Sequence, residues 1–170
     1  VVSLPGGLSG IVSLREISDL MESRVDQFGE SDHNDITETL PDLRDLFQAG
    51  QLLPCVVSRL DRADSGKHID LTTRPTLINS LSSESQIQSG MVLACSVVSV
   101  EPRGYVVDFG IARGFLPLKE IDGDVHKFVP GQPLMVRVVS RSSAAVTVSL
   151  RDVVTSKAKP SWNLSFQMLT

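Results

Sequence analysis

The sequence has few aromatic residues, few cysteines and no long apolar segment. Its 170 residues include six Phe, one Tyr and one Trp, although 41% of the residues are hydrophobic. No apolar run approaches the roughly 20 residues that a membrane-spanning helix needs, and residues 1–5 lack the basic flank of a secretory signal. The sequence therefore predicts a soluble protein with an aliphatic core and no membrane partner.

The two cysteines and three histidines do not form a metal-binding pattern. Cys55 and Cys95 each lie in an alternating apolar segment, so we expect both thiols to point into the interior and to stay reduced. His33, His68 and His126 are scattered among polar residues, without the spacing of a zinc site. We therefore expect no metal, no cofactor and a reducing compartment.

Residues that could support catalysis are also sparse. Asp108, Glu120 and Asp122 have no companions at metal-site spacing, no nucleophile stands beside a plausible base, and no glycine-rich loop could hold a phosphate. The sequence thus predicts no catalytic residue and no small-molecule substrate. We expect this segment not to be an enzyme.

Negative charge is concentrated near the start of the chain. The net charge is −4, yet residues 1–45 contain ten of the twenty acidic residues and only three arginines, so the remainder is weakly basic. An acidic segment repels phosphate. Any main contact with nucleic acid is therefore expected in the second half.

A segment near the start of the chain recurs in the second half. Gly10–Ile17 (GIVSLREI) returns as Gly114–Ile121 (GFLPLKEI), with Gly, Leu, Glu and Ile in register. Both copies are followed by the pattern Phe-x-x-Gly-Gln-x-Leu, at Phe47–Leu53 and at Phe128–Leu134. Such a repeat is the signature of a duplicated small domain.

Short β-branched segments between turn residues predict five strands in the second half. The predicted strands are 91–100, 105–109, 114–118, 134–140 and 145–150. Five strands in about 65 residues favour a closed barrel of the oligonucleotide-binding type.

The first half fits the same template with one strand missing and one insertion. Its predicted strands are 1–4, 8–14, 52–60 and 68–72, without an equivalent of the first strand. A barrel short of one strand has an unpaired edge, so we expect the sequence to start inside a larger protein.

The insertion, residues 18–45, holds nine acidic residues and leads into a segment, 40–47, whose apolar residues have helical spacing. Two interpretations of it stand. It is either a disordered, solvating loop, because charged and polar residues dominate 26–35, or a docking segment for a basic partner in which 40–47 caps the barrel.

The predicted fold class is all-β, with two tandem five-stranded barrels of the oligonucleotide-binding type. The first barrel lacks its first strand in this chain and carries the partly helical or disordered acidic insertion. The predicted domains are 1–74 for the first barrel, 75–89 for a linker, 90–151 for the second barrel and 152–170 for a linker toward a further module.

The order of these motifs resembles the S-one domain, a five-stranded RNA-binding barrel. The resemblance is carried by the turn glycines, the Glu-Ile corner, the Phe-x-x-Gly-Gln-x-Leu pattern and a final Val-Ser-Leu at 148–150. Two further segments, Leu4–Gly10 and Leu40–Arg44, are similar to the amino-terminal repeats of large eukaryotic proteins that carry many S-one repeats and process precursor ribosomal RNA.

The resemblance implies a non-catalytic ribosome-biogenesis factor of the nucleus and nucleolus that acts in assembly of both ribosomal subunits. The partners it implies are precursor ribosomal RNA, ribosome assembly factors and the small nucleolar ribonucleoprotein. These expectations come from the likeness and not from composition.

S-one domains typically grip single-stranded RNA with aromatic side chains on their second and third strands, and those aromatics are missing here. The aligned positions hold Arg103, Val106 and Pro117. Tyr105 is the residue that could take the place of these aromatics and stack on a base. Strand alternation, however, also places its side chain in the core. Phe109, Phe115 and Phe128 are expected in the core.

The remaining candidates for RNA contact are cationic side chains that could bind phosphate. Each of them, taken alone, is equally well explained as an ordinary solvent-exposed charge with no RNA-binding role. The candidate RNA-binding residues are Arg103, Tyr105, Arg113, Arg137, Arg141 and Arg151. We expect weak or auxiliary RNA contact and a scaffold role. The alternative is an S-one RNA-binding module of a ribonuclease or translation factor that binds single-stranded RNA directly.

Overall fold

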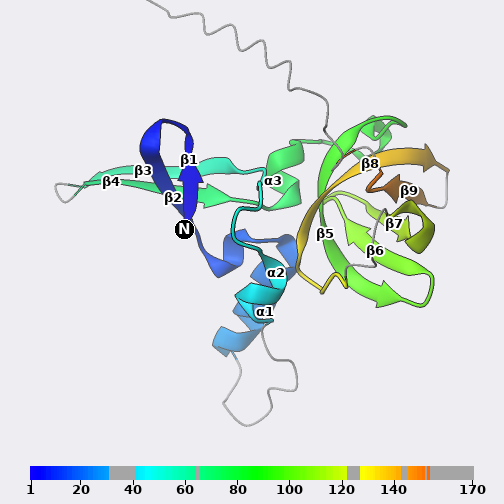
Figure 1. Ribbon diagram of the computed structural model, residues 1–170, viewed down its shortest axis with the longest axis horizontal. Coiled ribbons are helices and arrows are strands. Elements are labelled where there is room, and N and C mark those ends of the chain that lie inside the picture. Colours follow the sequence, from blue (N-terminus) through cyan, green and yellow to red (C-terminus); the bar gives the residue numbers. More distant parts are fainter. Residues whose placement is uncertain (31–40, 64–65, 122–126, 143–144, 152, 154–170) are drawn as a thin grey trace, which may run out of the picture.

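Two β-sheets lie side by side with short helices below and between them (Figure 1). The computed structural model describes residues 1–30, 41–63, 66–121, 127–142, 145–151 and 153, with backbone only for 28–30, 61–63 and 66–68. The strands are β1 (Val2–Leu4), β2 (Leu8–Val12), β3 (Val56–Ala63), β4 (Gly66–Thr72), β5 (Val92–Glu101), β6 (Gly104–Asp108), β7 (Arg113–Pro117), β8 (Pro133–Arg141) and β9 (Val146–Ser149). The α-helices are α1 (Asp19–Glu30), α2 (Leu43–Leu46) and α3 (Pro75–Asn79), and 3₁₀ turns lie at Pro5–Gly7, Leu14–Glu16, Glu84–Gln86 and Leu118–Glu120.

The second half forms a closed barrel in the order β5-β6-β7-β9-β8. All neighbours are antiparallel except β7 and β9, which run parallel. Side chains of alternating residues point inward, so that Val97, Val107, Leu116 and Val148 are fully buried. The prediction of an all-β fold with a closed five-stranded barrel is confirmed for this half.

The first half forms an open sheet of four strands in the order β1-β2-β4-β3. This is the order β6-β7-β9-β8 of the barrel, and β2 and β4 are parallel, as β7 and β9 are. The β-bulge also recurs, between Val57 and Arg59 in β3 and between Val138 and Ser140 in β8. The structure thus shows one barrel and one open sheet of matching topology, not two closed barrels.

The repeated Glu-Ile corner holds the end of the last strand in both halves. The carbonyl of Glu16 accepts the Thr73 N–H at 2.8 Å, and the carbonyl of Glu120 accepts the Leu150 N–H at 2.9 Å. The hydroxyl one residue earlier, from Thr72 or Ser149, donates to the same carbonyl. The corner thereby fixes where β2 meets β4 in the first half and where β7 meets β9 in the barrel.

The Phe-x-x-Gly-Gln-x-Leu pattern forms the same turn twice. The Gln51 side-chain oxygen accepts the Gln48 N–H at 3.1 Å, and Gln132 does the same for Val129 at 3.1 Å. The glycine inside each turn has a positive φ, which costs a glycine nothing. Because these turns precede β3 and β8, they set the register of both strands.

One predicted strand boundary was wrong. The predicted strand 52–60 begins only at Val56 as β3, and residues 51–55 belong to no strand. The acidic insertion, expected to be partly helical or disordered, contains the helix α1 over Asp19–Glu30, and residues 31–40 lie outside the described part. The Ser18 hydroxyl accepts the Met21 N–H and starts this helix, which buries Met21 against Ile17 and Leu46.

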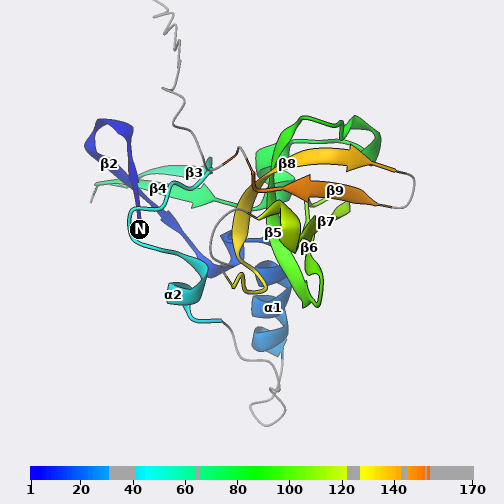
Figure 2. The ribbon, with the colours of Figure 1, turned by 45° about the vertical axis from the view of Figure 1, so that its right-hand side comes forward.

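The predicted helix at 40–47 is present in part as α2, with the Asp42 side chain as its cap. Among the described residues, no helix has the length and apolar character needed to cross a membrane. The helix α3 lies between the two sheets, and α1 and α2 lie below them (Figure 2). Val129 of the barrel's turn packs on the cluster of Met21 and Leu46.

The linker after β4 ties the two halves together. The Asn79 amide nitrogen donates to the carbonyls of Ala94 and Phe109, and its oxygen accepts the Ala94 N–H at 2.9 Å. Gly110 lies so close to Thr76 that a Cβ there would stand 2.5 Å from the threonine hydroxyl. The barrel is therefore held against the linker by the hydrogen bonds of the Asn79 side chain and by the close approach of Gly110 to Thr76. These contacts leave little room for movement between the linker and the barrel.

Arg74 joins the same linker to α1. Its Nε donates to Asp19 at 2.9 Å and its Nη1 to Glu22 at 2.7 Å. Burial works against the charge, but the hydrogen bond to Asp19 and the charges of Asp19 and Glu22 outweigh it and raise the pKa of Arg74. The guanidinium thus stays charged and holds the helix.

Replacing Arg74 by Met should lower the free energy of unfolding by about 1.5–3 kcal/mol, because it removes two charge-assisted hydrogen bonds. The side chains of Arg74 and Asp19 are only 19% and 20% exposed, and that of Glu22 is 38% exposed. Urea unfolding followed by circular dichroism measures this. Arg15→Met is the matched control: its ion pair with Asp26 is more than half exposed and should cost no more than about 0.5 kcal/mol. Equal losses for both variants would contradict the assignment.

Candidate nucleic-acid interface

The outer face of β6 and β7 is the part of the barrel that corresponds to the RNA face of the resembled domains. Its register pairs Val106 with Phe115 and Asp108 with Arg113. Phe115 is also opposite Thr147 of β9. These side chains alternate with the fully buried Val107 and Leu116, so they point outward.

Phe115 is the functional candidate that sequence reasoning missed, because it was expected in the core. It is partly exposed, whereas Gly114 and Leu116 on either side of it are buried. Its ring lies against Gly104, where a Cβ would be 2.9 Å from the Phe115 Cζ. An aromatic ring therefore does lie on the outer face, and strand alternation counted from Leu116 would have found it.

Tyr105 lies inside the barrel with 3% of its surface exposed. Its ring meets Phe128 edge to face, with centroids 5.2 Å apart and planes at 71°. A base cannot reach this ring without opening the barrel. Of the two aromatic residues on β6 and β7, Phe115 is the one available for stacking.

The candidate arginines on the β6–β7 hairpin do not form one cluster. Arg103 lies in the turn before β6 and Arg113 at the start of β7, which is the opposite end of the hairpin. Both are exposed, and the four-residue rise of β6 separates these ends by about 14 Å. They stand at the two ends of the face whose middle holds Phe115.

The other three arginines lie elsewhere on the barrel, and the guanidinium of Arg141 already contacts its neighbours. Arg141 donates to the Ile87 carbonyl at 3.3 Å and lies 3.9 Å from a Glu84 carboxylate oxygen. Arg137 is partly buried on β8 opposite Ser149. Arg151 is exposed just after β9, and its backbone N–H donates to the Ser149 hydroxyl. The six predicted residues are thus spread over the barrel instead of converging on one site.

The first sheet offers a poorer surface at the same positions. Ile11 occupies the place of Phe115, and its neighbour on β4 is Asp70 where the barrel has Thr147. Ser13 stands at the place of Pro117, at the start of the 3₁₀ turn. An aliphatic side chain beside a carboxylate neither stacks well on bases nor attracts phosphate.

The described part of the chain holds no metal-binding cluster. No three His, Cys, Asp or Glu side chains there could hold a metal ion. Cys55 and Cys95 are free, and burial raises the pKa of the Cys95 thiol well above its usual range, with a smaller contribution from Asp108. Cys95 is thus a buried, inert thiol of the core.

The closed barrel, its strand order and its outer face define an all-β protein of the oligonucleotide-binding barrel class. No protein-family model matches the chain. The chain is similar, however, to "Protein RRP5 homolog" of Mus musculus, with 34% identity over 180 residues, and of Homo sapiens, with 33% identity over 180 residues. Each alignment covers 97% of this chain and 10% of the relative.

A plant relative extends this similarity. "rRNA biogenesis protein RRP5" of Arabidopsis thaliana is 34% identical over 146 residues, which is 83% of this chain and 7% of that protein. The resemblance that the motifs predicted is therefore confirmed. The chain spans about a tenth or less of the length of these curated relatives.

Replacing Phe115 by Ala should weaken binding of single-stranded RNA by about 1–3 kcal/mol, because one base loses its aromatic stacking partner. Fluorescence anisotropy of the 170-residue chain with a labelled oligoribonucleotide measures the change. Phe115→Leu keeps the apolar bulk but has no aromatic face, so it should lose most of the affinity that Phe115→Ala loses. Tyr105→Phe should leave affinity unchanged, and a larger loss for Tyr105→Phe than for Phe115→Ala would show that the stacking residue is wrongly assigned.

Proposed function

We propose that this chain is a segment of a non-catalytic ribosome-biogenesis factor that acts in processing of precursor ribosomal RNA and in assembly of both ribosomal subunits. The observation that carries the proposal is similarity at 33–34% identity, over nearly the whole chain, to proteins named for rRNA biogenesis. On this proposal the protein works in the nucleus and nucleolus. Its partners are precursor ribosomal RNA, assembly factors and the small nucleolar ribonucleoprotein.

The first sheet is, in the same proposal, a five-stranded barrel that lacks the counterpart of β5. Its strand order, parallel pair, bulge, corner and turn all repeat those of the complete barrel. The domain division that goes with it is 1–74, a linker 75–89, a second barrel 90–151 and a further linker 152–170. The Asn79 and Arg74 contacts support a rigid pairing of the two modules.

Within this factor the two modules act mainly as a scaffold with an auxiliary RNA contact on the barrel. One aromatic ring, Phe115, and two exposed arginines at the ends of its face are a small surface for RNA. The first module carries Asp70 at the position where the barrel has Thr147, and its helix α1 adds further acidic residues. Protein docking is therefore the larger part of its role.

The alternative is a module of a ribonuclease or translation factor that binds single-stranded RNA strongly and directly. The outward ring of Phe115 is the observation that favours it. The two proposals differ in affinity and in salt dependence, because a strong binder neutralises several phosphates.

The deciding titration uses the 170-residue chain and single-stranded RNA at several salt concentrations. We expect micromolar or weaker affinity at physiological salt, with a slope of log K against log salt of about −0.7 to −1.4, as for one or two phosphate contacts with single-stranded RNA. Submicromolar affinity with a slope steeper than about −4 would overturn the scaffold proposal in favour of direct RNA binding.

A further inference from the structure

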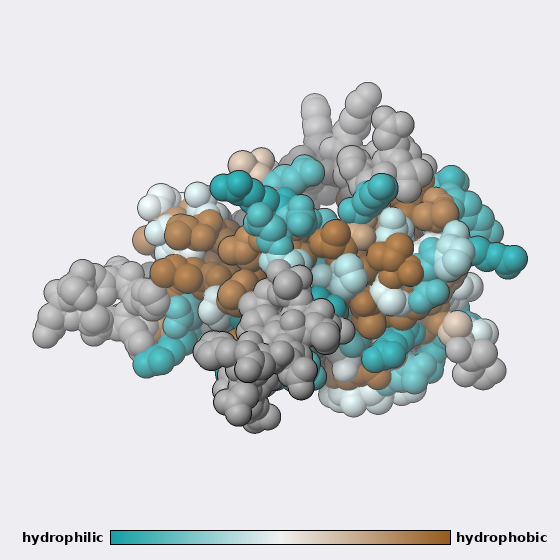
Figure 3. All heavy atoms as spheres, turned by 90° about the horizontal axis from the view of Figure 1, so that it is seen from below, coloured by the Kyte–Doolittle hydropathy of each residue, from teal (hydrophilic) through white to brown (hydrophobic). Residues whose placement is uncertain are grey.

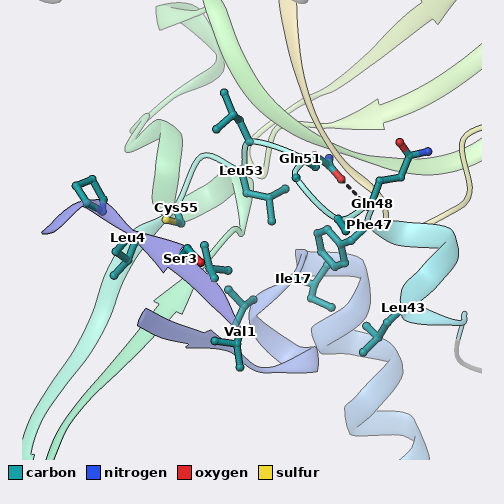
Figure 4. A pocket seen from close by; sticks show the side chains of 16 residues that line it. Val1, Ser3, Leu4, Ile17, Leu43, Phe47, Gln48, Gln51, Leu53 and Cys55 are labelled. Carbon is teal, nitrogen blue, oxygen red and sulfur yellow. Dashed lines mark hydrogen bonds between the residues drawn. The ribbon is translucent and has the colours of Figure 1, made fainter. Parts of the chain in front are cut away.

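The groove in the first half of the chain offers RNA no cations. It has a volume of about 730 Å³ and is lined mainly by β1 and by residues 47–55 (Figure 4). None of the sixteen described residues that line it carries a charged side chain. Brown patches over the left half of Figure 3 mark further hydrophobic residues of this half. Because RNA needs cations along its path, any contribution of the first half to binding at Phe115 passes through its contacts with the barrel.

The connection between β6 and β7, residues 109–112, decides which way the Phe115 ring points. The hairpin pairs Val106 with Phe115 and Asp108 with Arg113. A slip of this pairing by one residue would turn Phe115 into the barrel, because successive side chains of a strand point to opposite faces. The outward ring therefore depends on a connection that is held in one conformation.

Part of this connection is held by the hairpin itself. The Phe109 N–H donates to the Ala112 carbonyl at 2.9 Å, and the Gly110 N–H donates to the Asp108 carboxylate at 2.8 Å. Gly110 has a φ of +93°, a conformation that glycine adopts without strain but does not enforce. The linker supplies further contacts from outside the barrel.

The side chain of Asn79 bridges β5 and the connection. Its amide nitrogen donates to the Phe109 carbonyl at 3.2 Å and to the Ala94 carbonyl at 2.8 Å, and its oxygen accepts the Ala94 N–H at 2.9 Å. The ladder between β5 and β6 ends at Ser96 opposite Asp108, so Ala94 lies just beyond it. The Asn79 amide, with its donors and its acceptor, thus stands in for the peptide group that a longer β6 would present to Ala94.

Phe109 transmits this restraint to β7. Its side chain is fully buried, and its ring lies so close to Gly114 that a Cβ there would stand 2.8 Å from it. Gly114 directly precedes Phe115 and is paired with Val107 of β6. The carbonyl and the ring of one residue therefore connect Asn79 with the strand that carries Phe115.

The start of α3 is fixed to the first half of the chain. A Cβ on Gly110 would stand 2.8 Å from the Thr76 Cα, so α3 lies directly against the connection. The Thr76 N–H donates to an Asp19 carboxylate oxygen at 3.5 Å, and Arg74 pairs with the same carboxylate at 2.9 Å. The linker helix is therefore held between α1 and the connection.

We propose that Asn79 is a positioning residue for RNA contact on the barrel. It fixes the 109–112 connection and thereby keeps Phe115 and Arg113 on the outer face. The linker, and through Arg74 the first half, then belongs to the RNA-contacting unit without touching RNA. This inference rests on the RNA contact proposed above.

Two substitutions of Asn79 in the 170-residue chain test this role. Asn79→Ala removes all three hydrogen bonds, whereas Asn79→Asp keeps the shape and the acceptor but, as a carboxylate, cannot donate to the Phe109 carbonyl. In both variants the Phe109 amide should exchange its hydrogen at least roughly tenfold faster, because the connection opens more often. Hydrogen exchange followed by NMR measures this. The Val138 amide, bonded to the Met91 carbonyl, reports on the rest of the barrel and should change less.

The same variants should bind single-stranded RNA about three- to tenfold more weakly, as expected for a residue that acts on a site through its neighbours. Fluorescence anisotropy with a labelled oligoribonucleotide measures the affinity. Most of this loss should disappear in a chain that already carries Phe115→Ala, because both substitutions then act on the same contact.

Two control variants separate positioning from general loss of stability. Leu77→Ala lies on the same helix, and Leu77 is 45% exposed. Val138→Ala removes a buried side chain from β8, which pairs with neither β6 nor β7. Both should keep the RNA affinity of the unsubstituted chain at a temperature where all variants are folded.

An unchanged Phe109 amide in both Asn79 variants would overturn the proposal, and so would faster exchange with unchanged RNA affinity. Equal losses of affinity for Val138→Ala and Asn79→Ala would overturn it too, because lost stability would then explain both. RNA binding that depends on Phe115 but not on Asn79 defeats this inference alone. If the unsubstituted chain binds no RNA, the proposed RNA contact fails and this inference fails with it.

Discussion

A single carbonyl at each Glu-Ile corner holds the end of the last strand in both halves of this protein. Each carbonyl accepts the backbone N–H that follows the last strand and a hydroxyl one residue earlier. Each such bond contributes about 0.5–1.5 kcal/mol, but leaving the carbonyl buried and unpaired would cost about 1–3 kcal/mol. The parallel pairs β2–β4 and β7–β9 therefore depend on these hydrogen bonds. The closure of the barrel, the outer face that carries Phe115 and the two edges of the open sheet depend in turn on the parallel pairs.

The same framework carries different surfaces. In the barrel it is complete and presents one aromatic ring between two arginines, and in the first sheet it presents an acidic position and an open apolar edge. The linker fixes one half to the other through Asn79 and Arg74. A pair with one small candidate face for RNA and one open apolar edge fits the proposed scaffold role better than a strong RNA clamp.

Much of this fold is predictable from the sequence, because β-branched alternation and the repeated corner locate all nine strands within a few residues. Phe115 was misplaced because its face depends on the register of the β6–β7 hairpin, which the connection at 109–112 sets. The helix α1 was missed because few of its residues are apolar; Arg74 and the Met21–Leu46 contact hold it, and both are distant in sequence. The strand-like pattern of 52–55 misplaced the start of β3, because a strand forms only where a neighbouring strand pairs with it, and the sequence already showed no equivalent of the first strand in this half.

The central claim is that the two halves share the same framework of strands, corner and turn, while the surface that contacts RNA is small. Crosslinking of the full-length protein to precursor ribosomal RNA in cells, resolved to single residues by mass spectrometry, tests it most directly. The account predicts sparse crosslinks in these two modules, confined to the outer face around Phe115 and Arg113 and absent from the first sheet. Dense crosslinks along the first sheet, at Ile11 and the strands beside it, would contradict it.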